Sequence, residues 1–133
     1  MTTFLDTNAI IALLDNNHLH NSWAVQTLMA RKALGPAVLS DIVYCEISVA
    51  MVRREDVDEA IIRLGLDRAD CSDDALFRAG KAFKRYREVN SGPKLGVMPD
   101  FIIGAIAESE NVPLMTLNTK DFADYFKIEL ISP

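Results

Sequence analysis

Near its start the chain reads Thr3-Phe4-Leu5-Asp6-Thr7-Asn8 and continues as Ala9-Ile10-Ile11-Ala12-Leu13-Leu14. The apolar residues before Asp6 are typical of a short buried strand, and the spacing after it is typical of a helix. Asp6 would then lie at the carboxyl end of a strand, where open α/β sheets bind their ligands. Because Asp, Thr and Asn are also good helix caps, capping is an alternative role for Asp6.

The composition is that of one small domain. The chain has 133 residues, 50% of them hydrophobic, so we expect residues 1–133 to form a single domain with a substantial core. The longest apolar runs are well short of the ~20 residues of a membrane span, so we expect no membrane association. Cys45 and Cys71 show neither zinc-site spacing nor a disulfide framework, which favours a reducing, cytoplasmic location.

The charge is unevenly distributed along the chain. The net charge of −5 argues at first against a nucleic-acid partner, because phosphate binding usually requires a basic surface. The segment 78–94, however, holds six basic residues and one acid, a net charge of +5 that leaves −10 for the remainder. The sequence therefore predicts one basic segment on an acidic body.

Strands and helices alternate over the whole length. We expect strands at 3–5, 37–39, 112–116 and 128–131, with a further edge strand within 66–71. We expect helices at 7–17, 21–32, 41–53, 55–64, 72–89, 100–110 and 118–126, and a Gly- and Pro-rich loop at 90–99. This pattern predicts an α/β fold with a central, mostly parallel sheet of about five short strands and helices on both faces.

Glu46 is the most informative single residue. On the expected helix its neighbours in projection are Ile42, Val49 and Ala50, so the carboxylate lies on the apolar face. A buried carboxylate needs a cation, a hydrogen-bond network or a raised pKa. A buried ion pair with Arg53 is one explanation, but buried ion pairs are weak stabilisers, which favours a functional role for Glu46.

Further polar groups occupy comparable positions in the second half of the chain. Asp100 follows the loop and begins the most apolar helix. Its role is either that of an acid that stabilises the helix start or that of a site residue. The strand ending at Thr116 leads to Asn118 and Asp121, and either side chain would supply a fourth oxygen ligand. Asn118 and Asp121 also resemble a helix cap with its reciprocal partner.

The acids have no nearby Cys, converging His or glycine-rich phosphate loop beside them. Oxygen ligands of this kind select Mg²⁺ or Mn²⁺. A carboxylate cluster that holds one or two such ions activates a water molecule and stabilises the attacking and leaving oxygens of a phosphodiester. The Thr7 hydroxyl is then expected to hydrogen-bond a ligand carboxylate or a water on the ion.

Four motifs in this order resemble the PIN-domain ribonucleases of the VapC toxin type. They are Phe4-Leu5-Asp6-Thr7-Asn8, Ser40 with Glu46, Pro99-Asp100-Phe101-Ile102-Ile103-Gly104-Ala105 with Ala107, and Leu114-Met115-Thr116 with Lys120-Asp121-Phe122. The resemblance covers residues 1–133 and implies a PIN-like three-layer sandwich. It also implies a metal-dependent endoribonuclease that forms a homodimer and is inhibited by a cognate antitoxin wrapped over its active site.

The resemblance also assigns roles to residues. The catalytic, metal-binding acids of the family correspond to Asp6, Glu46, Asp100 and Asp121. Asp121 is preferred for the fourth position because Asn118 stands where many members have Asp. The residues expected to hydrogen-bond and orient these ligands, without contacting the ion, are Thr7, Asn8, Thr116 and Asn118.

The leading hypothesis is a Mg²⁺- or Mn²⁺-dependent endoribonuclease. The basic segment would accept phosphates of the RNA substrate through Arg85, Arg87 and Lys94, unless it is an ordinary solvated helix face. One alternative is a non-catalytic PIN-fold module whose acidic cleft binds an arginine-bearing peptide. Another is an aspartyl phosphatase or phosphoacceptor domain built on Asp6, although such enzymes place a second Asp where this chain has Asn8.

Overall fold

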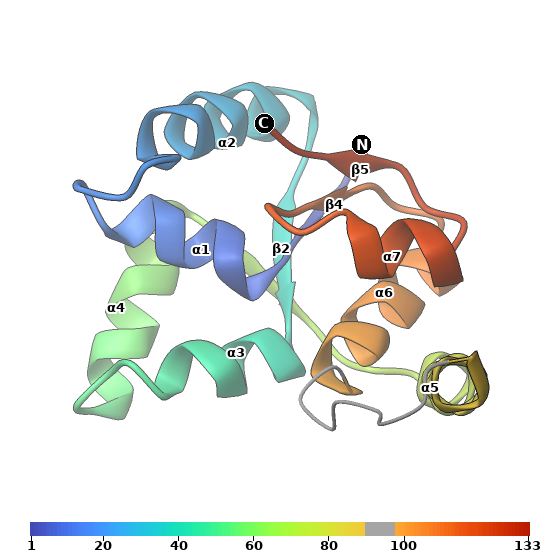
Figure 1. The fold of residues 1–133 in the computed structure, drawn as a ribbon. Helices are drawn as coiled ribbons and strands as arrows, with labels where there is room; N and C mark the ends of the chain where they lie inside the picture. The colour runs from blue at the N-terminus through green and yellow to red at the C-terminus, as the bar shows by residue number, and fades with distance from the viewer. Residues whose placement is uncertain (90–97) are drawn as a thin grey trace.

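The computed structural model describes residues 1–89 and 98–133 and is built on a five-stranded sheet (Figure 1). The strands lie in the order β3-β2-β1-β4-β5, and all neighbouring strands are parallel. Their bounds are β1 Thr3–Leu5, β2 Ala37–Ser40, β3 Asp67–Ala69, β4 Leu114–Met115 and β5 Leu130–Ile131. The predicted α/β fold with a parallel central sheet is confirmed.

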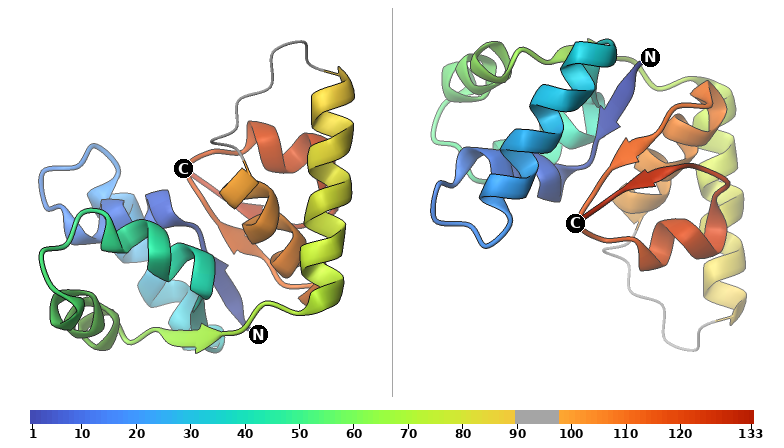
Figure 2. Two further views of the ribbon diagram at one scale, coloured as in Figure 1. Left: turned by 90° about the horizontal axis from the view of Figure 1, so that it is seen from below. Right: turned by 90° about the horizontal axis from the view of Figure 1, so that it is seen from above.

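Helices cover both faces of the sheet, with α2 on one side and α6 on the other (Figure 2). Their bounds are α1 Thr7–Leu14, α2 Asn21–Leu34, α3 Asp41–Ser48, α4 Arg54–Leu64, α5 Asp73–Val89, α6 Met98–Glu110 and α7 Lys120–Tyr125. None of the helices in the described ranges has the length and apolar character needed to cross a membrane.

Strand β1 lies in the middle of the sheet. Phe4 is paired with Val38 of β2 and with Leu114 of β4, and all of β1 is buried. A strand covered on both faces is mostly apolar, which is why Phe4 and Leu5 are both apolar rather than alternating with polar residues; the buried Thr3 hydroxyl accepts a hydrogen bond from Arg31 Nε at 2.9 Å. Since all strands are parallel, the ends of β1, β2 and β4 open on the same edge of the sheet.

Helix α6 is held close to α7 through Gly104. A Cβ atom at Gly104 would lie 2.6 Å from Cδ2 of Phe126 and 3.1 Å from Cδ1 of Phe122. Phe101 and Phe122 are fully buried beside this contact. The packing places the first turn of α6, which carries Asp100, near the beginnings of α1 and α3 (Figure 1).

The predicted helix from 41 to about 53 is wrong at its end, because α3 stops at Ser48. The Ser48 hydroxyl donates to the Tyr44 carbonyl at 2.6 Å, a bond that competes with helix hydrogen bonding. The Arg53 N–H donates to Asp56 Oδ2 at 3.1 Å, which starts a new helix, α4. Helical periodicity continues through the residues between the two helices, so the pattern alone did not reveal the break.

Other predicted boundaries differ by a few residues. Helix α1 ends at Leu14 rather than near 17, and α7 begins at Lys120 rather than 118. The edge strand predicted within 66–71 is present as β3. The predicted loop at 90–99 lies mostly outside the described residues, and its last two residues, Met98 and Pro99, belong to α6.

Candidate functional site

Asp6 is buried at the junction between β1 and α1, with 2% of its surface exposed. One carboxylate oxygen accepts a hydrogen bond from the Thr7 N–H at 2.7 Å, and the other accepts one from the Thr116 hydroxyl at 2.7 Å. Burial raises the pKa of Asp6 from 3.8 to about 6, the hydrogen bonds oppose this rise, and the charge of Glu46 adds to it. Asp6 does stand at the cap position of α1, but it also accepts a hydrogen bond from Thr116, directly after β4, which capping does not require.

Glu46 faces the same junction from α3. The Thr7 hydroxyl donates to Glu46 Oε1 at 2.7 Å, the type of hydrogen bond predicted for this threonine. Glu46 is only half-buried, and the buried residues of α3 are Val43 and Ile47, so its predicted place in the middle of the apolar face is wrong. The proposed ion pair with Arg53 is also wrong, because that guanidinium pairs with Asp56 at 3.2 Å.

Asp100 approaches from the first turn of α6 and completes the cluster. Burial is the largest cause that raises its pKa to about 7, and the charges of Asp6, Glu46 and Asp121 add to the rise. Because Asp6, Glu46 and Asp121 all act on the charge of Asp100, the four predicted acids lie in one region of the molecule. None of the ion pairs within residues 1–89 and 98–133 includes any of them.

Thr116 connects the acids to the turn after β4. While its hydroxyl donates to Asp6, it accepts the Asn118 N–H at 3.0 Å. The Asn8 side-chain oxygen accepts the Leu117 N–H at 2.9 Å, which ties α1 to the same turn. The predicted supporting residues therefore meet here, although Asn118 contributes backbone groups to these bonds. Helix α7 begins after Thr119 without a side-chain cap, so the predicted pairing of Asn118 with Asp121 as cap partners is wrong.

The donor set fits a hard divalent cation in its chemistry. All the converging side-chain donors are oxygens, and their mutual repulsion needs positive charge to offset it. In the described part of the chain, no three His, Cys, Asp or Glu side chains already form a ligand group around one point. Mg²⁺ needs no such cage, because it is usually held by one or two carboxylates, water molecules and substrate phosphates.

The basic segment divides into residues with different environments. Arg78 is held within the fold, since Nε donates to Glu108 Oε1 and Nη2 donates to the Tyr125 carbonyl, both at 2.8 Å. Arg85 lies over the Tyr125 ring, with 5.3 Å between the guanidinium carbon and the ring centroid. Arg87 is exposed on α5, and Lys94 lies outside the described residues. Arg85 and Arg87 therefore remain candidate RNA contacts.

A family model matches most of this chain. The family model described as PIN domain matches residues 3–127. The chain belongs to the PIN domain family. The motifs that predicted a PIN domain are thus confirmed at the level of family and fold. No curated protein matches this PIN domain.

Several solved structures share the fold across nearly the whole chain. VapBC2 from Rickettsia felis, bound to a promoter DNA fragment, has a TM-score of 0.76 at 23% identity and covers 99% of this chain and 98% of that chain. FitAcB from Neisseria gonorrhoeae has a TM-score of 0.72 at 17% identity, with 98% and 97% covered. VapC20 from Mycobacterium tuberculosis, described as a Sarcin-Ricin loop cleaving toxin, has a TM-score of 0.69 at 20% identity, with 98% and 99% covered.

Proposed function

We propose that this PIN domain is a metal-dependent endoribonuclease and the toxin of a toxin–antitoxin pair. The observation that carries the proposal is the convergence of Asp6, Glu46, Asp100 and Asp121 at one edge of the sheet, without a paired cation in the described residues. Like charges that are buried or half-buried together destabilise a fold unless a ligand or proton neutralises them, so their presence favours a site over a structural role. The fold shared with VapC20, described as a toxin that cleaves the Sarcin-Ricin loop, supports RNA as substrate.

The chemistry follows from how the chain holds these oxygens. When bound, Mg²⁺ or Mn²⁺ supplies Lewis-acid activation of water and neutralises charge on the phosphodiester. Asp6 and Asp100, with Glu46 and Asp121 beside them, would hold the ion. Thr116 orients Asp6, and Thr7 orients Glu46, so two carboxylates are positioned before the substrate arrives.

The proposed partners follow from the same site. A cluster of carboxylates attracts a cationic side chain, so a cognate antitoxin that inserts an arginine would block both metal and RNA. The Rickettsia felis neighbour is a VapBC2 complex, and a Mycobacterium tuberculosis neighbour is described as a member of the VapBC family of toxin–antitoxin systems. We therefore infer an antitoxin partner. The resemblance to VapC-type PIN domains supports a homodimer, and the two unpaired cysteines support a cytoplasmic location.

The test is RNA cleavage by acid variants in the presence of Mg²⁺ or Mn²⁺. Asp6→Asn and Asp100→Asn should each lower the cleavage rate by more than ~100-fold. This loss exceeds the ~10–100-fold loss of activity that is typical when a residue that only orients a metal ligand is replaced. Asp67→Asn, an exposed acid on β3, is the matched control and should cleave like the wild type. Circular dichroism and melting curves establish that the variants fold. Wild-type cleavage rates in both site variants would refute the assignment.

A second candidate function is a non-catalytic module that uses the acid cluster to bind an arginine-bearing peptide. It is favoured by the absence, within the described ranges, of three side chains already arranged around one ion. Calorimetric titration with Mn²⁺ separates the two functions, because the module predicts no saturable binding. A phosphoacceptor role for Asp6 is less well supported, because both its oxygens already accept hydrogen bonds and Asn8 is bonded to the Leu117 backbone.

A further inference from the structure

An open groove of about 510 Å³ runs between α5 and the segment that leads from α7 toward β5. Three basic and two acidic side chains line it. The lining residues that matter here are Arg78, Arg85, Glu108, Asp124, Tyr125 and Lys127. Arg78 and Arg85 belong to the basic segment of the sequence, whereas the third basic residue, Lys127, lies far from that segment along the chain.

One acid in the groove is already occupied. Glu108 accepts the Arg78 Nε at 2.8 Å with one oxygen and the Lys127 backbone N–H at 2.8 Å with the other. The Arg85 and Lys127 side chains have no ion-pair partner among residues 1–89 and 98–133. Among the described residues, Asp124 is then the one lining acid that opposes these two cations. The groove therefore favours an anion.

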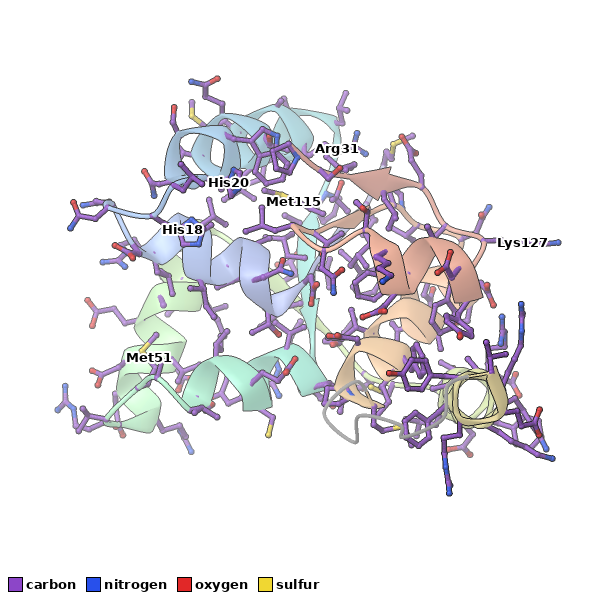
Figure 3. The ribbon with its side chains drawn as sticks, viewed as in Figure 1. His18, His20, Arg31, Met51, Met115 and Lys127 are labelled. Carbon is purple, nitrogen blue, oxygen red and sulfur yellow. The ribbon has the colours of Figure 1, made fainter. Side chains whose placement is uncertain are left out.

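Aromatic rings hold the guanidinium groups in place. Arg85 lies 5.3 Å from the Tyr125 ring centroid, and Arg78 lies 5.1 Å from that of Phe126. A ring beneath a guanidinium restricts its motion. Arg78 Nε and Nη2 already donate within the fold, so it is the N–H edge of Arg85 that can make a planar, bidentate contact with phosphate. Lys127 points outward from the connection after α7 (Figure 3), where its flexible ammonium can reach a phosphate from another direction.

The groove lies close to the acid cluster along α7. Asp121 is in the first turn of α7 and Tyr125 is its last residue, a separation of about 6 Å along the helix axis. The Tyr125 ring is 5.2 Å from the ring of Phe101, the residue that follows Asp100. An anionic strand that passes the acids therefore reaches the groove within about one helical turn.

We propose that this groove binds a backbone phosphate of the RNA strand that flanks the cleaved bond, with Arg85 and Lys127 as its phosphate contacts. The inference rests on the proposed endoribonuclease function. Contacts of this kind position the strand and carry no sequence information, so they act on affinity and not on the choice of base. Lys127 and Asp124 have no role in the catalytic cluster, which makes them independent probes of the groove.

The experiment measures binding of a fluorescent single-stranded RNA by anisotropy, in EDTA, over a series of KCl concentrations. Arg85→Gln and Lys127→Gln should each weaken binding about 3- to 10-fold and reduce the salt slope by about 0.7, the value for one phosphate contact on a single strand. Asp124→Asn should strengthen binding. In cleavage assays, Arg85→Gln should raise KM with little change in kcat.

Matched controls separate the groove from net charge. Lys84→Gln removes the same charge from an exposed position on α5, and Asp67→Asn matches Asp124→Asn on the distant strand β3. Equal effects of Lys84→Gln and Arg85→Gln, or unchanged RNA binding by Arg85→Gln and Lys127→Gln, would overturn the inference. Wild-type protein that neither binds nor cleaves RNA would instead overturn the proposed function itself.

Discussion

Asp6 and Asp100 lie in one acid cluster, yet the fold holds them in different ways. Asp6 is 2% exposed and accepts hydrogen bonds from Thr7 and Thr116. Asp100 is only partly buried and accepts no hydrogen bond from the described residues. The less buried carboxyl nevertheless has the higher pKa, about 7 against about 6.

The difference shows what hydrogen bonds do within a buried acid cluster. Bonds donated to a carboxylate stabilise its charged form and offset part of the desolvation of Asp6. Asp100 receives no such bond from residues 1–89 and 98–133, and the charges of Asp6, Glu46 and Asp121 also raise its pKa. We therefore infer that Asp6 is the fixed side of the site, and Asp100 is the side that adjusts when a cation or substrate arrives.

The largest expected effect concerns stability against pH in EDTA. The folded-state pKa of Asp6 is about 6, above its ordinary 3.8, so the unfolded chain ionises first and stability falls as pH rises through this interval. Asp6→Asn should remove this loss and raise the free energy of unfolding at pH 7.5 by up to about 3 kcal/mol. Urea unfolding at pH 4 and pH 7.5 measures the effect.

The control for this pH experiment is Asp67→Asn, which should follow the wild-type pH dependence. A wild-type protein equally stable at pH 4 and pH 7.5, with no gain in Asp6→Asn, would show that the buried charge of Asp6 does not destabilise the fold. Asp100→Asn makes the same test for the second acid. It should also reduce the fall in stability with rising pH, and this reduction should extend to about pH 7, because the pKa of Asp100 is about 7.

The next effect is stabilisation by Mn²⁺, which distinguishes the fixed acid from the adjustable one. Mn²⁺ at 100 times its Kd should raise the free energy of unfolding by about 2.7 kcal/mol. Asp100→Glu should keep part of this gain, because no hydrogen bond from the described residues fixes its carboxylate. Asp6→Glu should lose nearly all of it, because Thr7 and Thr116 fix the original carboxylate. Thermal melting with and without Mn²⁺ measures the gain, and equal losses in both variants would contradict the comparison.

Much of the fold was predictable because local patterns and tertiary packing agree. The strands of a parallel sheet are short apolar runs, and Asp6 and Thr116 stand directly after two of them. Parallel strands bring such residues to one edge, so the meeting of their side chains followed from topology. The ligand roles of the acids remain predictions.

The parts that were missed depend on contacts that no local pattern encodes. Glu46 was placed on an apolar face because Val49 continued the helical pattern, but the helix ends at Ser48 and Val49 is 87% exposed. Lys127 is far in sequence from the basic segment and reaches the groove only through the path of the chain after α7. Neither outcome has a signature in composition or spacing.

A smaller effect is expected from Thr116→Val, which removes one of the two hydrogen bonds to Asp6 and leaves Glu46 and Asp100 unchanged. The substitution deletes the hydrogen bond to Asp6 and leaves the Asn118 N–H without its acceptor. We expect a loss of about 2 kcal/mol at pH 7.5, because buried groups that lose their partners are costly. The loss should be smaller at pH 4, where Asp6 is protonated. Thr119→Val, which removes no side-chain cap bond, is the matched control in urea unfolding.

The smallest effect is expected from Thr7→Val, which separates the two hydrogen bonds of this residue. Valine keeps the backbone N–H that Asp6 accepts but removes the hydroxyl that donates to Glu46. Because Thr7 is only half-buried, we expect a loss of about 1 kcal/mol in the free energy of unfolding. Mn²⁺ affinity should fall by about tenfold, since Glu46 loses the group that orients it.

Thr7→Ser is the control for this variant, because serine retains the hydroxyl and should restore both stability and Mn²⁺ affinity. Asp6 keeps both of its hydrogen bonds in Thr7→Val, so its contribution to the pH dependence of unfolding should remain. A pH dependence in Thr7→Val as flat as that of Asp6→Asn would show that Asp6 is not held independently of Glu46. The acids would then respond as one unit, and the division into a fixed and an adjustable side would be wrong.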